Sequence, residues 1–576
     1  MADTSFPGAS SRGGLAAPPH GIPGPRPGQH DRLPGAGRPV RPRHRPPPDR
    51  PGRPARRVRR QLAGPARRAA VACAWLAAGA FLYGCYLHIS RTVPVDSDGA
   101  ANALQAWDML HGNLLLRGWR LSDVSFYTTE LPEYMLIELA RGLRPDVVHV
   151  AGAITFTLLV LLAAMLAKGR RRGREGAVRM GIAAGIMLAP QLGSGVYVLM
   201  LDPDHVGTSV PVLLVWLLLD RAPRRWYVPL AVTALLTWAQ VADSMATIIG
   251  ALPLLVVCGI RCYHRIVTAR RPPGDWWFEL SVAAGALISA VAAKAALTLI
   301  AGRGGFRVWP VSSQLTSFSA LPGHLLLAAH GLLLLFGADF FGGHLGLAAV
   351  LAMLHWTGLA LAAAAVWVAA RRFADGGDLV TQVLVAAVVI DLAGYVCGTR
   401  AVDLHSTREI AAVLPFSAVL AARLLARRLD AARMVPALLI AASGYLLGLG
   451  QEMAQPAQPA QGQQLASWLA ARHLDYGLAG YWQAASTTLA SRGAVQVLPV
   501  QSWRGTISRG GWETDAAWYD PLRHTATFLV LPPGQPGLGY PWSFDARATF
   551  GQPARIYDDG PYTVLVWNRN LLTGLR

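Results

Sequence analysis

Two aspartates follow the first long apolar segment of the chain, within the run Val95-Asp-Ser-Asp-Gly-Ala. Because the apolar segment covers about residues 70–90, Asp96 and Asp98 are expected at a membrane boundary. A carboxylate in a partly desolvated place is suited to taking a proton from a hydroxyl group. We therefore interpret Asp98 and Asp96 as candidate general bases. The alternative is that they cap a short helix beginning near Gly99, since aspartate is a preferred N-cap.

Arginines that could bind a phosphate occur much later, in the run Thr399-Arg-Ala-Val-Asp-Leu-His-Ser-Thr-Arg-Glu. A guanidinium fork matches two phosphate oxygens at once, so Arg408 and then Arg400 are candidate phosphate donors. Lys294, in the outer half of another apolar run, is a further candidate. Simpler interpretations are an ion pair between Arg408 and Glu409, and a lysine side chain that extends along its helix to the interface.

Further acids and two histidines are expected in the same compartment. Candidates for positioning a donor or acceptor are Glu130, Asp202, Asp204, His205, Asp243 and His405. The run Asp202-Pro-Asp-His is also a candidate ligand set for a divalent cation, because carboxylates and imidazoles bind such ions. Two acids and one histidine do not specify a metal, and a turn that caps the next helix is the simpler interpretation. The run from Glu130 to Glu133 is likewise typical of a helix start.

The composition excludes a soluble enzyme. Of 576 residues, 53% are hydrophobic and only 15% are charged, which is typical of a membrane protein. The formal net charge is +20, and arginine supplies nearly all the positive charge, with 51 arginines against two lysines. The five cysteines show neither zinc-ligand spacing nor a disulfide framework.

Apolar runs of membrane-spanning length recur from residue 69 to residue 450. Arginine-rich loops between them, such as Lys168-Gly-Arg-Arg-Arg-Gly-Arg, indicate the cytoplasmic side. The pattern predicts an α-helical polytopic membrane protein with about eleven transmembrane helices, the N-terminus inside and the C-terminus outside. The apolar stretch 321–341 is predicted to be interfacial, because a further span would place Arg371 and Arg372 outside.

The remaining segments differ from the apolar region in composition. Residues 1–68 are rich in arginine, proline and glycine and are predicted to be a disordered cytoplasmic tail. Residues 91–146 are predicted to form a long first external loop, and residues 451–464 a glutamine-rich linker. Residues 465–576 are predicted to form a small extracytoplasmic α/β domain.

Local patterns predict the elements of that C-terminal domain. Apolar periodicity favours helices, and alternating or β-branched runs favour strands. We predict helices over 465–474 and 478–489, strands over 495–500 and 527–531, and a hairpin over 555–567 with Asp559-Gly560 at its turn.

Together these motifs resemble the GT-C glycosyltransferases over roughly residues 70–450. The shared features are a carboxylate motif just after the first span, a long first external loop with short helices, an acidic second external turn, and an external arginine shortly before a span with Leu414-Pro415. Many GT-C relatives have adjacent Asp-Glu where this chain has Asp-Ser-Asp. The resemblance therefore does not decide between Asp96 and Asp98, and it indicates a superfamily rather than a substrate.

The resemblance implies a multi-pass enzyme of the plasma membrane. GT-C enzymes include dolichyl-phosphate-mannose protein mannosyltransferases and actinobacterial mannosyl- and arabinosyltransferases. By that likeness, this chain would transfer a sugar from a polyprenyl-phosphate carrier to a hydroxyl of a glycan, lipid or protein acceptor on the outer face, with inversion. No cofactor is required, a divalent cation at Asp202, Asp204 and His205 is an optional addition, and no nucleic-acid partner is expected.

Two other classes of protein fit the composition. A transporter or flippase of lipid-linked intermediates would carry charged residues in the middle of its spans and at corresponding positions in two halves of the chain. A non-catalytic scaffold would keep the fold but tolerate loss of the acids. The charges cluster on one side and no internal repeat is visible, which favours the enzyme. Aromatic pairs in the C-terminal domain, such as Tyr481-Trp482 and Trp518-Tyr519, either stack on sugars or, as the simpler interpretation, pack in its core.

Overall fold

A computed structural model describes residues 54–188, 194–201, 205–265, 276–310, 314–341, 346–375, 377–429, 434–531 and 540–575. The chain divides into two compact units, Met1–Ala70 and Val71–Arg576. The arrangement described below is that of the second unit.

Most of the described residues are helical. The helices of the membrane region are α1 (Pro54–Ser90), α2 (Ser97–Leu110), α3 (Glu130–Arg141), α4 (Asp146–Lys168), α5 (Gly173–Met187), α6 (Ser194–Val196), η1 (Tyr197–Leu201), α7 (Ser209–Arg221), α8 (Tyr227–Ala242), η2 (Thr247–Ala251), α9 (Leu252–Tyr263), α10 (Trp276–Gly302), α11 (Leu321–Leu335), α12 (Leu347–Arg371), η4 (Phe373–Asp375), α13 (Leu379–Cys397), η5 (His405–Ile410), α14 (Val413–Leu429) and α15 (Val435–Met453). Two short strands, β1 (Trp119–Leu121) and β2 (Arg307–Val308), lie in its loops.

Six of the helical segments are long and apolar enough to cross a membrane. They are Arg68–Ser90, Asp146–Lys168, Trp276–Gly302, Leu347–Arg371, Leu379–Cys397 and His405–Leu429. The prediction of a helical, polytopic membrane protein is therefore confirmed for the described part of the chain, whereas the count of eleven spans stays a prediction. α11 has 15 residues and is about 22 Å long, shorter than the ~30 Å hydrocarbon core; its interfacial position also stays a prediction.

Helices α4 and α14 pack in the centre of the bundle. α4 carries Asp146 in its first turn and Lys168 in its last, charges that suit the helix dipole at each end. Buried aliphatic residues of both helices belong to the main apolar core, together with residues of α5, α7 and α13. These two helices therefore form the rigid support on which the connecting loops are held.

Helix α1 starts earlier than the composition predicted. The expected disordered tail ended at residue 68, but the helix begins at Pro54. Arginine and alanine are frequent between these two positions, and both are good helix formers. Residues 1–53 of the predicted tail lie outside the described residues.

The segment between α1 and α4 folds into short elements with a core of their own. α2, β1 and α3 pack through apolar side chains such as Leu104, Trp119 and Tyr134. α2 begins directly after Asp96, whose side chain accepts a hydrogen bond from the backbone N–H of Gly99 at 3.2 Å. Asp96 is therefore the N-cap of α2, as the alternative interpretation of this residue expected.

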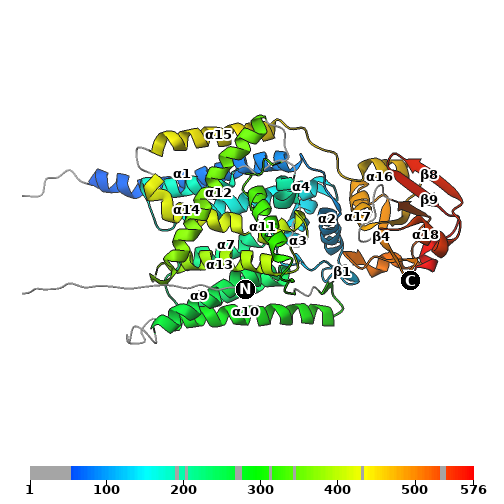
Figure 1. The fold of residues 1–576 in the computed structure, drawn as a ribbon, viewed down its shortest axis with the longest axis horizontal. Coiled ribbons are helices and arrows are strands. Elements are labelled where there is room, and N and C mark those ends of the chain that lie inside the picture. The colour runs from blue at the N-terminus through cyan, green and yellow to red at the C-terminus, as the bar shows by residue number, and fades with distance from the viewer. Residues whose placement is uncertain are drawn as a thin grey trace, which may run out of the picture. The chain divides into compact units, whose positions relative to one another are not determined.

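The C-terminal region contains a six-stranded sheet, and Figure 1 shows the region in orange to red. Its elements are α16 (Gln463–Ala470), β3 (Tyr476–Ala479), α17 (Tyr481–Ala490), β4 (Gln496–Trp503), β5 (Thr506–Arg509), β6 (Thr514–Asp515), η7 (Ala516–Tyr519), β7 (Phe528–Leu531), α18 (Ser543–Phe550), β8 (Arg555–Asp559), β9 (Tyr562–Val566) and η8 (Leu571–Gly574). The strand order is β5-β4-β3-β7-β9-β8. β3 is parallel to β4 and β7, and the other pairs are antiparallel.

The sequence predicted most of these elements correctly. The strands near 495–500 and 527–531 and the hairpin with Asp559-Gly560 at its turn are confirmed. The helix predicted over 478–489 was wrong at its start, because Tyr476–Ala479 forms the central strand β3 and α17 begins only at Tyr481. A short buried apolar run does not distinguish strand from helix by its periodicity alone.

The C-terminal region is joined to the first loop by backbone pairing. β1 pairs with β2 in parallel and with β6 antiparallel, with Trp119 opposite Asp515. The Oγ of Ser97, at the start of α2, donates to the backbone carbonyl of Tyr481 at 2.8 Å, and α17 packs along α2. The C-terminal sheet is thus held against the loop that carries Asp96 and Asp98.

Candidate functional site

The helical turn η5 presents three charged or aromatic side chains to three different neighbours. Arg408 Nη1 lies 3.9 Å from Asp98 Oδ2. Glu409 Oε2 lies 3.3 Å from His205 Nε2. The ring of His405 packs edge-on against Tyr197, with centroids 5.1 Å apart. The structure therefore brings the loop before α14 together with the first and second loops.

Asp98 also meets the C-terminal region. The hydroxyl of Tyr481 is in hydrogen-bond contact with Asp98 Oδ1, and it lies 2.6 Å from Glu513 Oε2. One phenol O–H donates to only one carboxylate at a time, so the second contact is favourable when that carboxyl group is itself protonated. Burial and the two acids raise the pKa of Tyr481 well above its ordinary value. The phenol therefore stays protonated and keeps its O–H for one of the two carboxyl groups.

Asp96 occupies a different environment from Asp98. It is 6% exposed, its Oδ1 caps α2, and its Oδ2 accepts a hydrogen bond from the Tyr197 hydroxyl. Its two oxygens thus hold the start of α2 and the neighbouring helix η1 together. Among the described contacts, the ion pair with Arg408 is made by Asp98.

A series of ion pairs links four loops near the contact between Asp98 and Arg408. His205 Nδ1 lies 2.8 Å from Asp243 Oδ2, and its Nε2 faces Glu409. Glu409 in turn lies 3.7 Å from Arg400 Nη1, and Arg400 Nη2 donates to Asp123 at 2.7 Å. These contacts fix the spacing of the loops that carry the candidate residues.

His205 is buried and takes part in two of these ion pairs. Burial alone would lower the pKa of His205, but the carboxylates of Asp243 and Glu409 raise it well above its ordinary value. Asp243 is further held by the hydroxyl of Thr208 and by the backbone N–H of Met245 at 2.8 Å. The imidazole therefore acts as a charged link between two carboxylates.

Only His205 of the predicted divalent-cation site lies in the described structure, where Asp243 Oδ2 is 2.8 Å from its Nδ1 and Glu409 Oε2 is 3.3 Å from its Nε2. Among the described residues, no group of three or more His, Cys, Asp or Glu side chains has the arrangement of a metal site. Asp202 and Asp204 lie outside the described residues.

Glu130 and Glu133 lie in the first turn of α3, close to the second loop. The Glu130 carboxyl accepts from the Thr129 hydroxyl and lies against Gly207, where a Cβ would overlap it. Burial, and secondarily the charge of Glu130, raise the pKa of Glu133 to about 8. Thr155 donates to Glu133 at 3.2 Å. These acids thus pack between α3 and α4 beside the second loop.

Lys294 is placed apart from these residues. Its side chain is exposed on α10, where it lines a shallow groove with Val291, Thr298 and Arg303. Within the described contacts, no hydrogen bond or ion pair joins Lys294 to the acids and arginines around η5. The structure therefore brings together Asp98, Arg408, Arg400, His205, Asp243 and His405, but not Lys294.

Two buried amides extend the polar face of α2. Asn102 and Gln105 follow Asp98 by one and two helical turns and thus share its face. They are at most 1% exposed, and in the described structure their amide oxygens and nitrogens have no hydrogen-bond partner. Buried polar groups are normally paired with protein or with water. This face of α2 therefore has unused hydrogen-bonding capacity next to Asp98.

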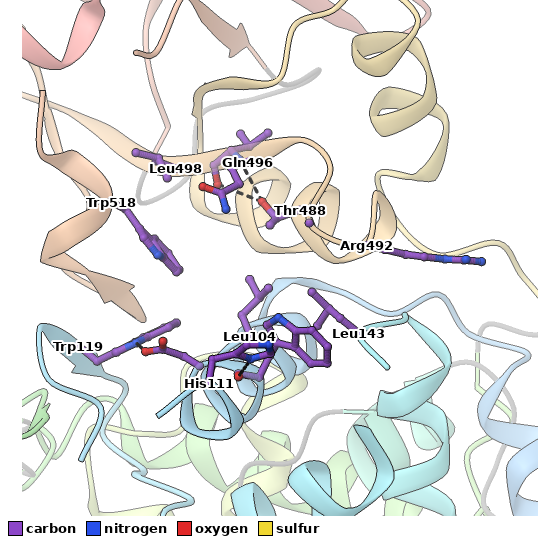
Figure 2. A pocket seen from close by; sticks show the side chains of 13 residues that line it. Leu104, His111, Trp119, Leu143, Thr488, Arg492, Gln496, Leu498 and Trp518 are labelled. Carbon is purple, nitrogen blue, oxygen red and sulfur yellow. Dashed lines mark hydrogen bonds between the residues drawn. The ribbon is translucent and has the colours of Figure 1, made fainter. Parts of the chain in front are cut away.

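A cavity of about 310 Å³ lies between the first loop and the C-terminal region. Figure 2 shows Leu104, His111, Trp119 and Leu143 on one side of it, and Thr488, Arg492, Gln496, Leu498 and Trp518 on the other. Trp119 packs edge-on against Trp518, with centroids 4.9 Å apart, and donates to Asp108 Oδ2 at 2.8 Å. The cavity borders a different face of α2 from Asp98. It therefore lies beside the acid–arginine contact and does not contain it.

Sequence reasoning missed several partners of the predicted residues. Tyr197, Asp123 and Glu513 were not candidates, and Tyr481 was considered only for stacking or packing. Tyr197 could have been noticed as a hydroxyl group within an apolar run. Asp123 and Glu513 are single acids without a local motif, and only the contacts with Arg400 and Tyr481 single them out.

No protein-family model matches this chain, and no curated protein matches it in sequence. Three solved structures of the Archaeoglobus fulgidus oligosaccharyltransferase are similar to it. The complex with Zn and sulfate has a TM-score of 0.42 and 13% identity, covering 76% of this chain and 64% of the archaeal one. The apo form has a TM-score of 0.45 and 12% identity, covering 80% and 69%.

The third structure is the archaeal oligosaccharyltransferase AglB from the same organism, in complex with an inhibitory peptide and a dolichol-phosphate. Its TM-score is 0.42 at 13% identity, covering 79% of this chain and 69% of the other. This chain thus spans between 64% and 69% of the length of these archaeal proteins. The likeness is distant, and the function is inferred below from the site itself.

Proposed function

We propose that this chain is a GT-C-type membrane glycosyltransferase that moves a sugar from a polyprenyl-phosphate carrier to an acceptor hydroxyl. The observation that carries the proposal is the 3.9 Å approach of the Arg408 guanidinium to the Asp98 carboxylate, where η5, α2 and the C-terminal region meet. A group that takes a proton and a group that binds a phosphate are the two requirements of such a transfer.

In the proposed reaction, Asp98 removes the proton from the acceptor hydroxyl. The acceptor oxygen forms a bond to the anomeric carbon while the bond from that carbon to the carrier's phosphate oxygen breaks. The phosphate leaves with the bonding electron pair and is held by Arg408, with Arg400 as the second cation. Attack from the face opposite the leaving phosphate inverts the anomeric centre, by the geometric logic of inverting glycosidases.

The contact between Asp98 and Arg408 explains how the base would be activated. Without a carrier, the guanidinium stabilises the charged form of Asp98 and so weakens it as a base. A bound phosphate competes for Arg408 and releases the carboxylate to accept the proton.

A transporter of lipid-linked intermediates is the second candidate function. Asp391, in the middle of α13, is 2% exposed and neither of its carboxylate oxygens has a hydrogen-bond partner among the described residues. An acid inside a membrane helix is by default a functional-site candidate. The enzyme is preferred because the charges around η5 combine a base with phosphate-binding groups.

The test is transfer of label from a panel of radiolabelled polyprenyl-phosphate sugars in membranes that contain the full chain. We expect Asp98→Asn and Arg408→Gln each to lower the rate of transfer by about 10²- to 10³-fold. Asp96→Asn is expected to keep far more activity, because asparagine is also a good N-cap. Asp520→Asn, in the C-terminal region away from the site, is the matched control and should transfer at the wild-type rate.

Unchanged transfer by Asp98→Asn would show that Asp98 is not the base. If no sugar donor is consumed by folded wild-type protein, movement of a labelled carrier lipid across proteoliposomes is measured instead. Carrier movement that is lost in Asp391→Asn and kept in Asp98→Asn would show that the chain is a transporter and not the proposed enzyme.

A further inference from the structure

A second cavity lies at the opposite ends of the bundle helices. It has a volume of about 720 Å³ and is bordered by the last residues of α7 and by the start of α13, with Arg170 just past the end of α4. α4 is 23 residues long, or about 35 Å, and its other end carries Asp146, which pairs with Arg91 and Arg141 beside the first loop. The cavity is therefore separate from the proposed active site.

Arginines dominate the lining of this cavity, which we call the arginine cavity. Its charged lining residues are Arg170, Arg171, Arg179, Arg224, Arg261 and Arg423, against the two acids Asp220 and Asp378. Phe278 and other apolar residues form the remainder of the wall. The lining thus carries a large excess of guanidinium groups.

Around the cavity, the acids that the structure describes are fewer than the arginines. Glu175 faces Arg179 at 2.9 Å and two more arginines within 3.5 Å. Glu279 faces Arg265 at 3.0 Å and likewise two more arginines within 3.5 Å. Asp220 and Asp378 both pair with Arg423, at 2.5 and 3.3 Å. With Arg170, eight arginines meet four acids among the residues that the structure describes, so arginine exceeds acid by four in this part of the chain.

Two of these arginines are deeply buried and incompletely paired. Arg179 is 9% exposed, and the Arg423 side chain is 10% exposed. In the described structure, Nε of Arg179 and Nη1 of Arg423 are buried without a hydrogen-bond partner. A buried N–H of a charged group is costly when it is unpaired. Both side chains line the arginine cavity, so an anion bound there would lie beside two guanidinium groups whose hydrogen bonding is incomplete.

Exposed aromatic side chains place the cavity at headgroup depth. Trp226 and Tyr227 are 72% and 41% exposed at the start of α8, and Tyr263 is 62% exposed at the end of α9. Trp277, in the first turn of α10, is 38% exposed. Exposed tryptophan and tyrosine at helix ends are typical of the membrane–water interface. Basic pockets between helices at this depth bind lipid headgroups.

From these observations we infer that the arginine cavity binds the phosphate group of an anionic phospholipid. The guanidinium forks match phosphate oxygens, and the aromatic residues hold the cavity at the depth where lipid phosphates lie. A free phosphate ion offers the same oxygens, so the experiment separates the two sources. The inference does not depend on the proposed glycosyltransferase activity.

The experiment titrates the purified full chain, in neutral detergent, with phosphatidylglycerol, phosphatidylcholine or inorganic phosphate and follows thermal unfolding. Phosphatidylglycerol should raise the Tm, and phosphatidylcholine should not. The double variant Arg170→Gln/Arg224→Gln should need at least tenfold more phosphatidylglycerol for the same rise, because two charge-assisted contacts are lost. The double variant Arg172→Gln/Arg428→Gln removes the same charge from arginines that do not line the cavity and should titrate like the wild type.

Several outcomes would overturn the inference. Equal stabilisation by phosphatidylglycerol and phosphatidylcholine would exclude selective binding of the anionic headgroup. A full effect of inorganic phosphate alone would assign the site to a soluble phosphate and not to a lipid. An equal loss in the Arg172/Arg428 variant would show only a response to net charge. If the Arg170/Arg224 variant elutes as unfolded protein, the wild-type comparison of the two lipids decides alone.

Discussion

At the scale of single residues, the proposed chemistry depends on how Asp98 is held. Arg408 approaches one carboxylate oxygen and the Tyr481 hydroxyl contacts the other. Tyr481 also contacts Glu513, so a residue of the C-terminal region connects an acid of the first loop with an acid of its own region. Tyr481 is a positioning residue in this scheme, because it acts on the reaction through Asp98.

Tyr481→Phe is expected to change the pH dependence of transfer. Loss of a hydrogen-bond donor to a carboxylate raises the pKa of that carboxylate. The acidic limb of the profile of kcat/KM against pH should therefore move to higher pH. The matched control is Tyr557→Phe, which removes a hydroxyl elsewhere in the C-terminal region and should leave the profile in place. A uniform loss of rate at every pH would indicate a purely structural role for Tyr481.

Glu133 provides a pH-dependent test of packing in the first loop. Its pKa of about 8 lies above the ordinary value of 4.5, so the folded state holds a proton that the unfolded state releases. The unfolding free energy should therefore fall as the pH rises from 4.5 to 8 and stay lower above that range. Glu133→Gln should flatten this decline and raise the Tm above pH 8, measured by thermal unfolding in detergent.

The control for this measurement is Asp475→Asn, which removes an exposed carboxylate and should keep the wild-type dependence on pH. A decline of equal slope in Glu133→Gln and the wild type would show that other groups cause it.

At the scale of elements, the contact between the first loop and the C-terminal region decides whether the site forms. The β1–β6 pair and the packing of α17 along α2 are the two links. Gly118 lies at the first link with a φ of +89°, and a Cβ at this position would overlap the carboxylate of Asp515. A residue with a Cβ at this position would have to displace the Asp515 carboxylate as well as adopt a positive φ, which favours glycine here.

Gly118→Ala should weaken this link and reduce both stability and transfer. Gly112→Ala is a matched control, because Gly112 has a φ of +104° but open space around its Cβ position. Both variants are expected to lose about 1 kcal/mol or more through the positive φ. Gly118→Ala should lose more, and limited proteolysis should cleave its linker at residues 451–464 faster. Equal behaviour of the two variants would argue against the β1–β6 contact as a required link.

At the scale of the whole molecule, charged side chains gather at two levels of the helical bundle. Acids and arginines meet around η5 beside the C-terminal region, whereas the arginine cavity lies where α4 and α7 end. The excess of arginine at the second level agrees with the positive-inside rule. The proposed orientation therefore places the C-terminal region outside the cell.

Cysteine labelling in intact cells tests that orientation. In a background with Cys73→Ser and Cys397→Ser, Leu522→Cys should react with a membrane-impermeant maleimide, because Leu522 is 94% exposed in the C-terminal region. Arg172→Cys, between α4 and α5, should react only after permeabilisation. The reverse pattern would invert the orientation and place the proposed transfer in the cytoplasm.

Some of the site was predictable because its residues carry local signals. Asp98 and Arg408 each stand next to a long apolar run, and a charge at a membrane boundary is costly unless it is used or solvated. His205 and Asp243 were found by the same reasoning, although their ion pair was not. Lys294 carried a similar signal but lies apart from η5, because position along a helix does not reveal which neighbour a side chain faces.

The sequence by itself determined that this is a helical membrane protein with a C-terminal sheet region, since apolar run length, periodicity and turn residues act over a few neighbouring positions. The tertiary structure alone decided that Tyr481 contacts both Asp98 and Glu513 and that Asp123 pairs with Arg400. These contacts join segments separated by up to 383 residues. Their formation depends on how all the helices pack together, which no local pattern records.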